Sequence, residues 1–242
     1  HQQAAYLFPS SDPHQSEYVA PRWDTRAWLS GFTGSAGTLI VTDSTAGVWT
    51  DSRYFIQAKA QLANTRVELQ KQRVPHAPEH VEWLANTLQS GDHLGFDGRV
   101  VSLSQARMLR SKLQTRGIHL EARYDLPGKI WANRPGMPKS EIFDFPVAYA
   151  GISREEKLGQ IRAWLETQQA NAILLTALDD IAWTLNIRAS DVDYNPVCIS
   201  YLIVDREGAR WFVGEDRVDE SLRRAMAAAG VHIMGYDAID GA

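Results

Sequence analysis

The chain has 242 residues, of which 44% are hydrophobic and 22% are charged, as in an ordinary globular protein with one large or two small domains. Its net charge of −4 gives no electrostatic reason to bind nucleic acid or an anionic membrane, and no apolar run approaches the roughly 18 residues of a membrane helix. The only cysteine, Cys198, excludes an internal disulfide and a cysteine-rich zinc site, and we expect a cytoplasmic protein without nucleic-acid or membrane partners.

The first predicted elements are a short buried strand over residues 6–8 and, after a loop, a helix. The Gly-rich stretch GFTGSAG follows at residues 31–37. It fits neither common phosphate-loop pattern, and it leads into a strand, whereas a phosphate loop opens a helix. We therefore interpret it as a tight bend, in which glycine supplies a backbone that other residues cannot adopt.

A β-hairpin is predicted over residues 38–55, with an Asp-containing turn and Gly47 as turn residues. Its second strand ends at Asp51 and Arg53. A catalytic acid with an arginine clamp is one interpretation of this pair. A strand-end ion pair within the domain is the simpler one, and we predict it.

The pattern HAPEH places His76 and His80 four residues apart. Pro78 lies between them and the pattern is not H-E-x-x-H, so we predict a helix that begins near Pro78 and no metal site. The first half ends with an amphipathic helix that stops at Gly117 and continues as a strand, in LRSKLQTRGIHLEA over residues 109–122.

A proline-rich connection separates the two halves. The prolines between residues 125 and 146 are Pro127, Pro135, Pro138 and Pro146. Such a segment favours an extended linker. We expect a first domain over residues 1–128, a linker over 129–153 and a second domain over 154–242.

The second domain is predicted to begin with a helix whose capping box is formed by Ser153 and Glu156. One apolar face of this helix carries Leu158, Ile161, Trp164 and Leu165. A short strand over residues 173–175 follows. Asp179 and Asp180 come next, and we interpret them as a helix N-cap rather than as a catalytic carboxylate pair.

The polar loop NIRASDVDYNP, residues 186–196, is the best candidate for a functional loop, because it lies between a predicted helix and a predicted strand. Its candidate site residues are Asn186, Arg188, Asp191 and Asn195. Cys198 follows in NPVCISYLIV, where we predict a strand rather than a nucleophile. The residues by themselves indicate no catalytic or metal-binding site.

The same order of elements occurs in both halves. YLIVDREGARWFVGEDRV (201–218) repeats the hairpin with Gly208 and Arg217, and LRRAMAAAGVHIMG (222–235) repeats the helix, glycine and strand of 109–122. Alternating helices and strands predict two similar α/β domains, each a mixed sheet with helices on both faces. Only the second half has a helix before its first strand, so we expect that the chain begins inside a longer sequence and lacks the first helix.

Five segments of this chain resemble one family in the same order: PSSDPHQSEY, GFTGSAGTLIVT, WTDSRYFIQA, LDDIAWTLNIRASDV and YNPVCISYLIV. Together they resemble the three-domain Xaa-Pro aminopeptidases (aminopeptidase P) of the creatinase/prolidase clan. The resemblance covers nearly the whole chain. It departs from the family at Ala189, where the family usually has glycine.

The resemblance implies two tandem creatinase/prolidase N-terminal-like α/β domains, followed in the family by a catalytic "pita-bread" domain. That domain binds two divalent metals, usually manganese, through two Asp, one His and two Glu, and none of its ligand motifs occurs in residues 1–242. The chain would therefore be a non-catalytic N-terminal region without a cofactor of its own. Its implied partners are its own catalytic domain, peptides with proline in second position, and a second copy in a homodimer.

The resemblance also implies where this region would affect catalysis. In related enzymes the N-terminal domain borders the active site, sometimes that of a neighbouring subunit. Contacts with the substrate or with another domain would then involve Asp51, Arg53 and the loop that carries Asn186, Arg188, Asp191 and Asn195.

Two other interpretations remain open. The same fold occurs without catalysis in histone-chaperone relatives, so the chain is alternatively a peptide- or protein-binding module. Another enzyme of the clan, such as creatinase or prolidase, is disfavoured by the internal repeat. Metal ligands in the residues that follow this region would indicate a peptidase, and lost ligands would indicate a binding module.

Overall fold

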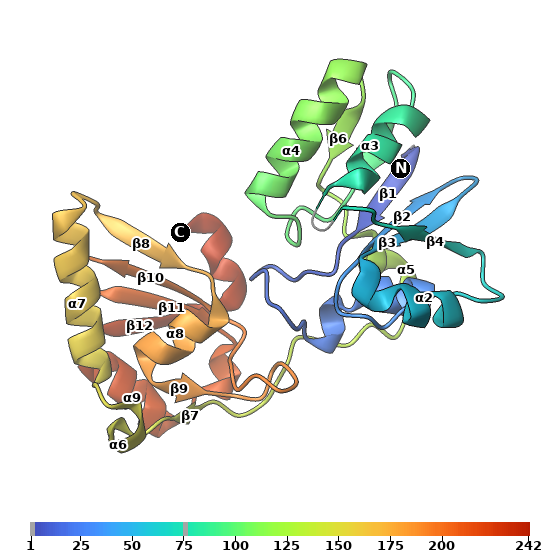
Figure 1. Cartoon of the computed structure of the whole chain (residues 1–242). Coiled ribbons are helices and arrows are strands. Elements are labelled where there is room, and N and C mark those ends of the chain that lie inside the picture. The colour runs from blue at the N-terminus through green and yellow to red at the C-terminus, as the bar shows by residue number, and fades with distance from the viewer. Residues whose placement is uncertain (1–2, 75–76) are drawn as a thin grey trace. The chain divides into compact units, whose positions relative to one another are not determined.

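The structure, a computed structural model, describes residues 3–74 and 77–242 (Figure 1). The chain divides into two compact units, residues 1–136 and 137–242, and the division falls inside the expected linker. Each unit has its own sheet. In the part of the chain that the structure describes, every helix is too short or too polar to cross a membrane.

The first unit is built on a six-stranded mixed sheet with the order β4-β3-β2-β1-β5-β6. The central strand β1 has four buried residues and pairs antiparallel with β2 and parallel with β5. The strands are β1 (Ala5–Phe8), β2 (Thr38–Thr42), β3 (Ala46–Thr50), β4 (Val67–Lys71), β5 (His93–Gly95) and β6 (His119–Glu121). The helices are η1 (Pro21–Trp23), α1 (Thr25–Ser30), η2 (Ser52–Tyr54), α2 (Phe55–Gln61), α3 (Glu79–Thr87), α4 (Leu103–Leu113), η3 (Gln114–Arg116) and α5 (Leu126–Ile130).

Helices cover both faces of this sheet, because the buried strands are apolar on both sides. On one face, α3 and α4 pack against Leu7, Ile40 and Leu94. On the other face, Phe8, Leu39 and neighbouring side chains contact α1, α2 and α5. α3 begins directly after Pro78, as the sequence indicates.

The second unit contains a four-stranded sheet with the order β12-β11-β10-β8 and a two-stranded sheet, β7-β9. The strands are β7 (Phe143–Asp144), β8 (Ala172–Leu175), β9 (Ile187–Arg188), β10 (Tyr201–Asp205), β11 (Ala209–Val213) and β12 (Val231–Gly235). The helices are α6 (Val147–Ala150), α7 (Arg154–Thr167), α8 (Leu178–Leu185), η4 (Glu215–Arg217), α9 (Glu220–Ala228) and η5 (Tyr236–Gly241).

As expected, helices flank both sheets, but the second sheet is covered less evenly than the first. The three longest helices of the second unit, α7, α8 and α9, all contribute to a single core on one face of its sheet. On the opposite face, Phe212 of β11 is buried, and Tyr236 of η5 stacks on Tyr201 of β10. Leu174 of β8 and His232 of β12, on the same face, are exposed.

The two large sheets share a four-stranded unit. β1, β2, β3 and β4 pair in the order antiparallel, antiparallel, parallel, and β8, β10, β11 and β12 pair in the same order. The predicted match of the two hairpins is therefore confirmed. The predicted equivalence of 109–122 with 222–235 is wrong, because β6 pairs with β5 at one edge of its sheet, whereas β12 occupies the position of β4.

Two hairpin details differ from the expectation. Gly47 lies inside β3, and the turn is closed by Thr42, whose Oγ1 accepts hydrogen bonds from the amides of Ser44 and Thr45. A Cβ at position 47 would approach the Trp49 ring to 3.0 Å, so this glycine makes room for packing. In the second hairpin, Asp205 Oδ1 accepts from the amide of Gly208 at 2.7 Å, as predicted for an Asp turn.

Candidate functional site

The candidate site is an open groove of about 570 Å³ in the first unit. Segments distant in sequence form it: the loop after β1, the Gly-rich loop, the end of β3, the residues that lead into α3, and one side of α4. Its described lining includes Ser10, Gln15, Glu17, Ser35, Thr38, Asp51, Arg53, Gln72, His80 and Gln105. The lining combines hydroxyl and amide groups, which suit hydrogen bonding to a peptide backbone, with apolar residues such as Pro9, Ala36 and Met108.

The Gly-rich wall of the groove is held by Arg26 of α1. This side chain is 4% exposed, and its guanidinium donates to the carbonyl of Phe32 at 2.7 Å, to the carbonyl of Gly34 and to Ser10 Oγ. It also lies over the Phe32 ring. Burial lowers the pKa of Arg26. The neutral oxygen acceptors satisfy the donors of this buried cation, so the loop conformation and the arginine depend on each other.

The glycines of this stretch have different roles. Gly31 ends α1 with a φ of 74°, the left-handed value expected at a helix C-cap. A Cβ at Gly34 would lie 2.3 Å from the Phe32 ring and 2.7 Å from that of Tyr54, so this glycine is required for close packing. The interpretation as a bend is therefore correct, and only Gly31 of the three needs a positive φ.

Asp51 and Arg53 form the predicted ion pair at the end of β3. Arg53 donates from Nε to Asp51 Oδ1 at 2.9 Å and from Nη2 to Asp51 Oδ2 at 2.8 Å, and Asp51 also caps η2. The Arg53 side chain is 63% exposed and lies over the Tyr54 ring, whose hydroxyl bonds to Ser35 Oγ. Because both residues of the pair line the groove, a structural role and a ligand contact are compatible.

His80 is the most perturbed group of the groove. Its Nδ1 is buried without a hydrogen-bond partner, and burial lowers its pKa to about 4. The imidazole is therefore neutral at neutral pH. The other histidine of HAPEH, His76, lies outside the described residues.

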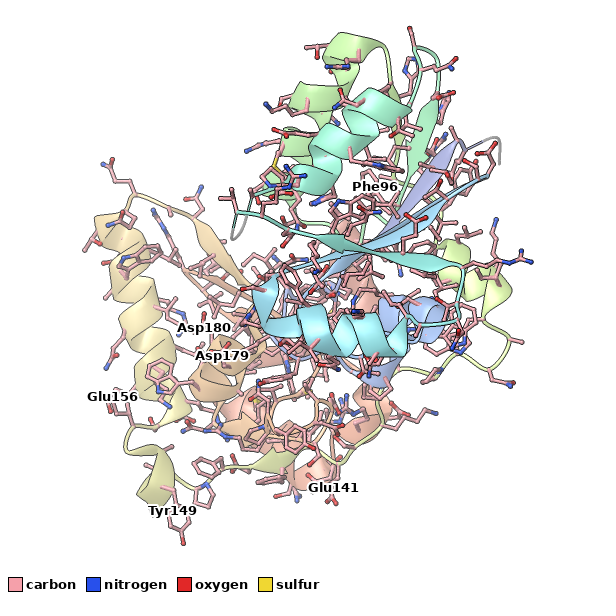
Figure 2. All side chains as sticks on the ribbon, turned by 45° about the vertical axis from the view of Figure 1, so that its right-hand side comes forward. Phe96, Glu141, Tyr149, Glu156, Asp179 and Asp180 are labelled. Carbon is pink, nitrogen blue, oxygen red and sulfur yellow. The ribbon has the colours of Figure 1, made fainter. Side chains whose placement is uncertain are left out.

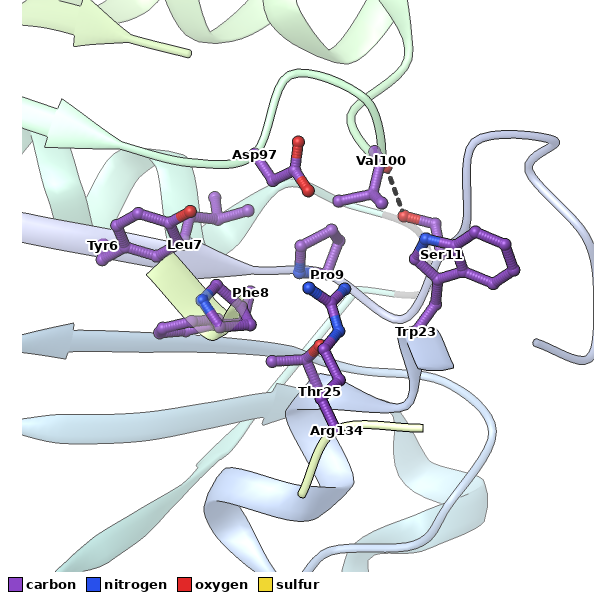
Figure 3. A pocket seen from close by; sticks show the side chains of 11 residues that line it. Tyr6, Leu7, Phe8, Pro9, Ser11, Trp23, Thr25, Asp97, Val100 and Arg134 are labelled. Carbon is purple, nitrogen blue, oxygen red and sulfur yellow. Dashed lines mark hydrogen bonds between the residues drawn. The ribbon is translucent and has the colours of Figure 1, made fainter. Parts of the chain in front are cut away.

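A second cavity of the first unit is small (Figure 3). It lies among Tyr6, Asp97 and Arg134, and its volume of about 20 Å³ is that of one water molecule rather than a substrate. The Tyr6 hydroxyl donates to the carbonyl of Tyr124 and accepts from the amide of Leu126 at 3.3 Å. Burial raises the pKa of both Tyr6 and Asp97. These groups tie the segment that contains α5 to the sheet.

The loop after α8 is a structural network rather than an open site. Asp191 is buried, accepts from Arg217 Nη2 at 2.6 Å and from the amide of Ile199 at 2.7 Å, and receives the Ser140 hydroxyl at 2.6 Å. Arg217, which repeats Arg53 in the sequence, thus makes a long-range ion pair where Arg53 makes a local one.

The other candidate residues in this loop also make hydrogen bonds within the second unit. Asn186 ends α8 with a φ of 49°, donates to the carbonyl of Ile152 at 2.9 Å and accepts from Lys157 Nζ at 2.6 Å. Arg188 donates to the carbonyl of Ala182 and stacks on the Phe145 ring. The backbone of Asn195 closes a turn with Val192.

Several sequence interpretations in this unit are wrong. Asp179 and Asp180 lie within the first turn of α8, whose N-cap is Ala177, so their charges favour the helix N-terminus without capping it (Figure 2). Trp164 of α7 is half exposed, whereas Lys157 of the same helix is buried. Cys198 lies in a buried segment between β9 and β10, and burial raises its pKa to about 12, which makes it a poor nucleophile.

The buried cations Arg26, Arg154 and Lys157 were missed by the sequence analysis. Lys157 donates to the carbonyl of Trp183 at 2.8 Å and lies over its ring, so its ammonium closes the C-terminal end of α8. Arg154 pairs with Asp144. A helical pattern of basic residues ordinarily indicates a solvent-exposed face, and no local signal distinguishes these from exposed ones.

Comparison with known proteins gives a consistent result for both units. Two family profiles, each described as creatinase/prolidase N-terminal domain, match residues 4–122 and 133–242. Aminopeptidase P2 of Arabidopsis thaliana is 38% identical over 97% of this chain and 33% of its own length. Xaa-Pro aminopeptidase 1 of Dictyostelium discoideum is 32% identical over 98% of this chain and 39% of its own length.

A solved structure agrees with these relatives. The X-prolyl aminopeptidase of Caenorhabditis elegans, described as a cytosolic enzyme with a di-nuclear active site, matches with a TM-score of 0.93 and 33% identity over 99% of this chain. The match covers 39% of the C. elegans chain. The present chain thus spans little more than a third of the length of these relatives.

We predict that Asp191→Ala destabilises the second unit by about 3–5 kcal/mol, because it leaves the buried Arg217 without its counter-charge. Asp193→Ala, two residues away on the exposed part of the loop, is the matched control and should change the free energy of unfolding by about 0.5 kcal/mol or less. Urea denaturation of the 242-residue chain measures both. Equal effects of the two substitutions would contradict a structural role for Asp191.

We also predict that His80 makes the first unit less stable in acid. In the unfolded state His80 takes up a proton near pH 6.5, whereas in the folded state it does so only near pH 4. The free energy of unfolding therefore has its full value above pH 6.5 and decreases as the pH falls from 6.5 to 4. The loss corresponds to about 3 kcal/mol at most. His80→Gln should flatten the pH dependence of the melting temperature over this window, while substitution of the exposed His232 by Gln should leave it unchanged.

Proposed function

Because residues 4–122 and 133–242 both belong to the creatinase/prolidase N-terminal domain family, we propose that this chain is the non-catalytic N-terminal region of a metal-dependent Xaa-Pro aminopeptidase. The parent enzyme would remove the N-terminal residue from peptides that have proline in second position. The observation that carries the proposal is that two such domains occur in tandem over a chain that is similar, through 97% of its length, to an aminopeptidase P.

The chemistry of the proposed parent belongs to a catalytic domain. A dinuclear metal centre, which we propose holds Mn²⁺, would supply a Lewis acid for the scissile carbonyl and an activated water. Within residues 3–74 and 77–242, no group of three or more His, Cys, Asp or Glu side chains is placed to hold a metal ion. The present chain would therefore contribute shape and binding. We further propose that the parent is a cytoplasmic homodimer.

The groove of the first unit is the part of this chain that we assign to the substrate. An extended peptide presents backbone N–H and C=O groups, and hydroxyl and amide side chains that can pair with them line the groove. Arg53 adds an exposed cation, which suits a peptide carbonyl or the peptide's C-terminal carboxylate. The groove would thus guide residues that follow proline, while the reacting bond lies in the catalytic domain.

The same groove also supports the second candidate, a peptide-binding module without catalysis. Both candidates need the polar groove, and only the peptidase needs a metal centre elsewhere in the protein. Activity of the full-length protein therefore decides between them, and binding of a peptide by this chain does not.

We predict that the full-length protein cleaves an Xaa-Pro peptide, that a chelator abolishes this activity and that Mn²⁺ restores it. The 242-residue chain should show no turnover with or without Mn²⁺, because it offers no clustered metal ligands among its described residues. A peptide-release assay on both proteins measures this. Turnover by the 242-residue chain, or a full-length protein that binds the peptide without cleaving it, would contradict the proposal.

We predict that Arg53→Ala in the full-length protein lowers kcat/KM by roughly tenfold to a hundredfold, the usual loss when a hydrogen bond to a charged group is removed. Arg123→Ala is a closely matched control. Arg123 pairs with Glu121 two residues away, again at 2.9 Å from Nε and 2.8 Å from Nη2, and it does not line the groove. Both variants should keep the melting temperature. Equal kcat/KM in the two variants would limit Arg53 to a structural role.

A further inference from the structure

The sheet of the first unit is only partly covered on one face of the strands β5 and β6. Leu94 and Leu120 project towards α3 and α4 on one face, and alternate residues of a strand point to opposite faces. His93, His119 and Glu121 therefore belong to the other face. The core on that other side, around Phe8 and Leu39, contains no residue of β5 or β6. Both histidines are accordingly exposed.

The two histidines lie side by side. β5 and β6 are parallel, and His93 is paired in register with His119. Their ring centroids are 5.1 Å apart, with an angle of 34° between the rings. This separation is close to the spacing of neighbouring strands, roughly 4.8 Å, so the sheet backbone itself fixes how far apart the two imidazoles can lie.

The next row of the sheet, beside the histidine pair, consists of Gly95 and Glu121. Gly95 follows His93 on the same face and carries no side chain, and the side chain of Gln3 occupies the space over it. Opposite Gly95 is Glu121, whose two carboxylate oxygens are held by Arg123 at 2.9 and 2.8 Å. The histidine pair thus faces solvent, with one tethered carboxylate in the next row of the sheet.

We infer that His93 and His119 form a two-histidine binding site for a late first-row transition-metal ion, of the class Cu²⁺, Ni²⁺ or Zn²⁺. A metal about 2.0–2.1 Å from each imidazole nitrogen needs two nitrogens roughly 3 Å apart, which rotation of two rings at this spacing provides. The rigid strand pairing reduces the entropy that chelation costs. The remaining coordination positions belong to water or to a donor from another molecule.

The chemistry of the ligands sets the selectivity. Imidazole suits zinc, copper and nickel, and affinity for such ligands rises from Mn²⁺ to Cu²⁺ and falls again at Zn²⁺. Two imidazole ligands therefore bind Mn²⁺ most weakly of these ions. The inference does not depend on the proposed peptidase function, since it concerns residues of the first unit alone.

The test is a Zn²⁺ titration of the 242-residue chain at pH 7.5, followed by calorimetry. The experiment is done in a His1→Ala background, because a histidine with a free amino group is itself a chelator. We expect one equivalent of Zn²⁺ to bind. His93→Ala and His119→Ala should each lower the association constant at least tenfold, and Cu²⁺ should bind more tightly than Zn²⁺ and Mn²⁺ most weakly.

Two matched variants control for the other histidines. His232→Ala removes an exposed histidine on the edge strand β12 of the second sheet, and His76→Ala removes one member of HAPEH. Both control variants should keep the Zn²⁺ affinity.

A second measurement locates the site directly. In the chain that keeps both histidines, substoichiometric Cu²⁺ should broaden the NMR signals of residues around 93 and 119 first. Unchanged Zn²⁺ affinity in His93→Ala and His119→Ala, or its loss in His76→Ala, would overturn the inference. The side chains of His93 and His119 are exposed, so their substitution should leave the melting temperature unchanged. An unchanged melting temperature then excludes unfolding as the cause of a lower Zn²⁺ affinity.

Discussion

The groove of the first unit depends on one buried guanidinium. Arg26 binds the carbonyls of Phe32 and Gly34 and the hydroxyl of Ser10, and so it joins the Gly-rich loop to the loop after β1. A buried charge that lost these acceptors would be strongly unfavourable, which gives the loop one conformation instead of many. Ser10 in turn donates to the carbonyl of Gly37 at 2.6 Å. The two walls of the groove are therefore fixed by the same hydrogen-bond network, before any ligand binds.

The second unit uses the same principle with different partners. Lys157 closes α8 through the carbonyl of Trp183 and the side chain of Asn186, and Arg217 joins Asp191. Each buried cation organises a segment that has little regular structure, and each is satisfied by oxygen atoms from distant parts of the chain. Because these donors and acceptors hold the fold, the polar character of residues 186–195 reflects internal hydrogen bonding. The groove of the first unit, which has an exposed arginine in its lining, fits a ligand better.

Local features of the fold were predictable from the sequence, and the sheet order was only partly so. The glycines Gly117 and Gly230 both end helical segments with positive φ, at 74° and 72°, because a helix that turns sharply into a strand needs this backbone at its C-terminus. That shared requirement also produced the wrong equivalence of β6 with β12. A helix, a glycine and a strand specify how one connection is built, but not at which edge of the sheet the strand pairs. Lys157 and Trp164 show the same limit, since periodicity identifies a helix face and tertiary packing decides which of its residues are buried.

The candidate site was predictable only where its residues are neighbours in sequence. Asp51 and Arg53 are two positions apart at a strand end, so their ion pair follows from local geometry. The groove combines the loop after β1, the Gly-rich loop, the entrance of α3 and one side of α4, and no pattern within any one of these segments implies the others. The sheet brings them together, since the loop after β1, the end of β3 and the segment after β4 leave the strand ends at the same rim. The Gly-rich stretch thus affects function through shape: it positions a wall beside Arg53, and the chemistry that we propose for the parent enzyme belongs to residues of another domain.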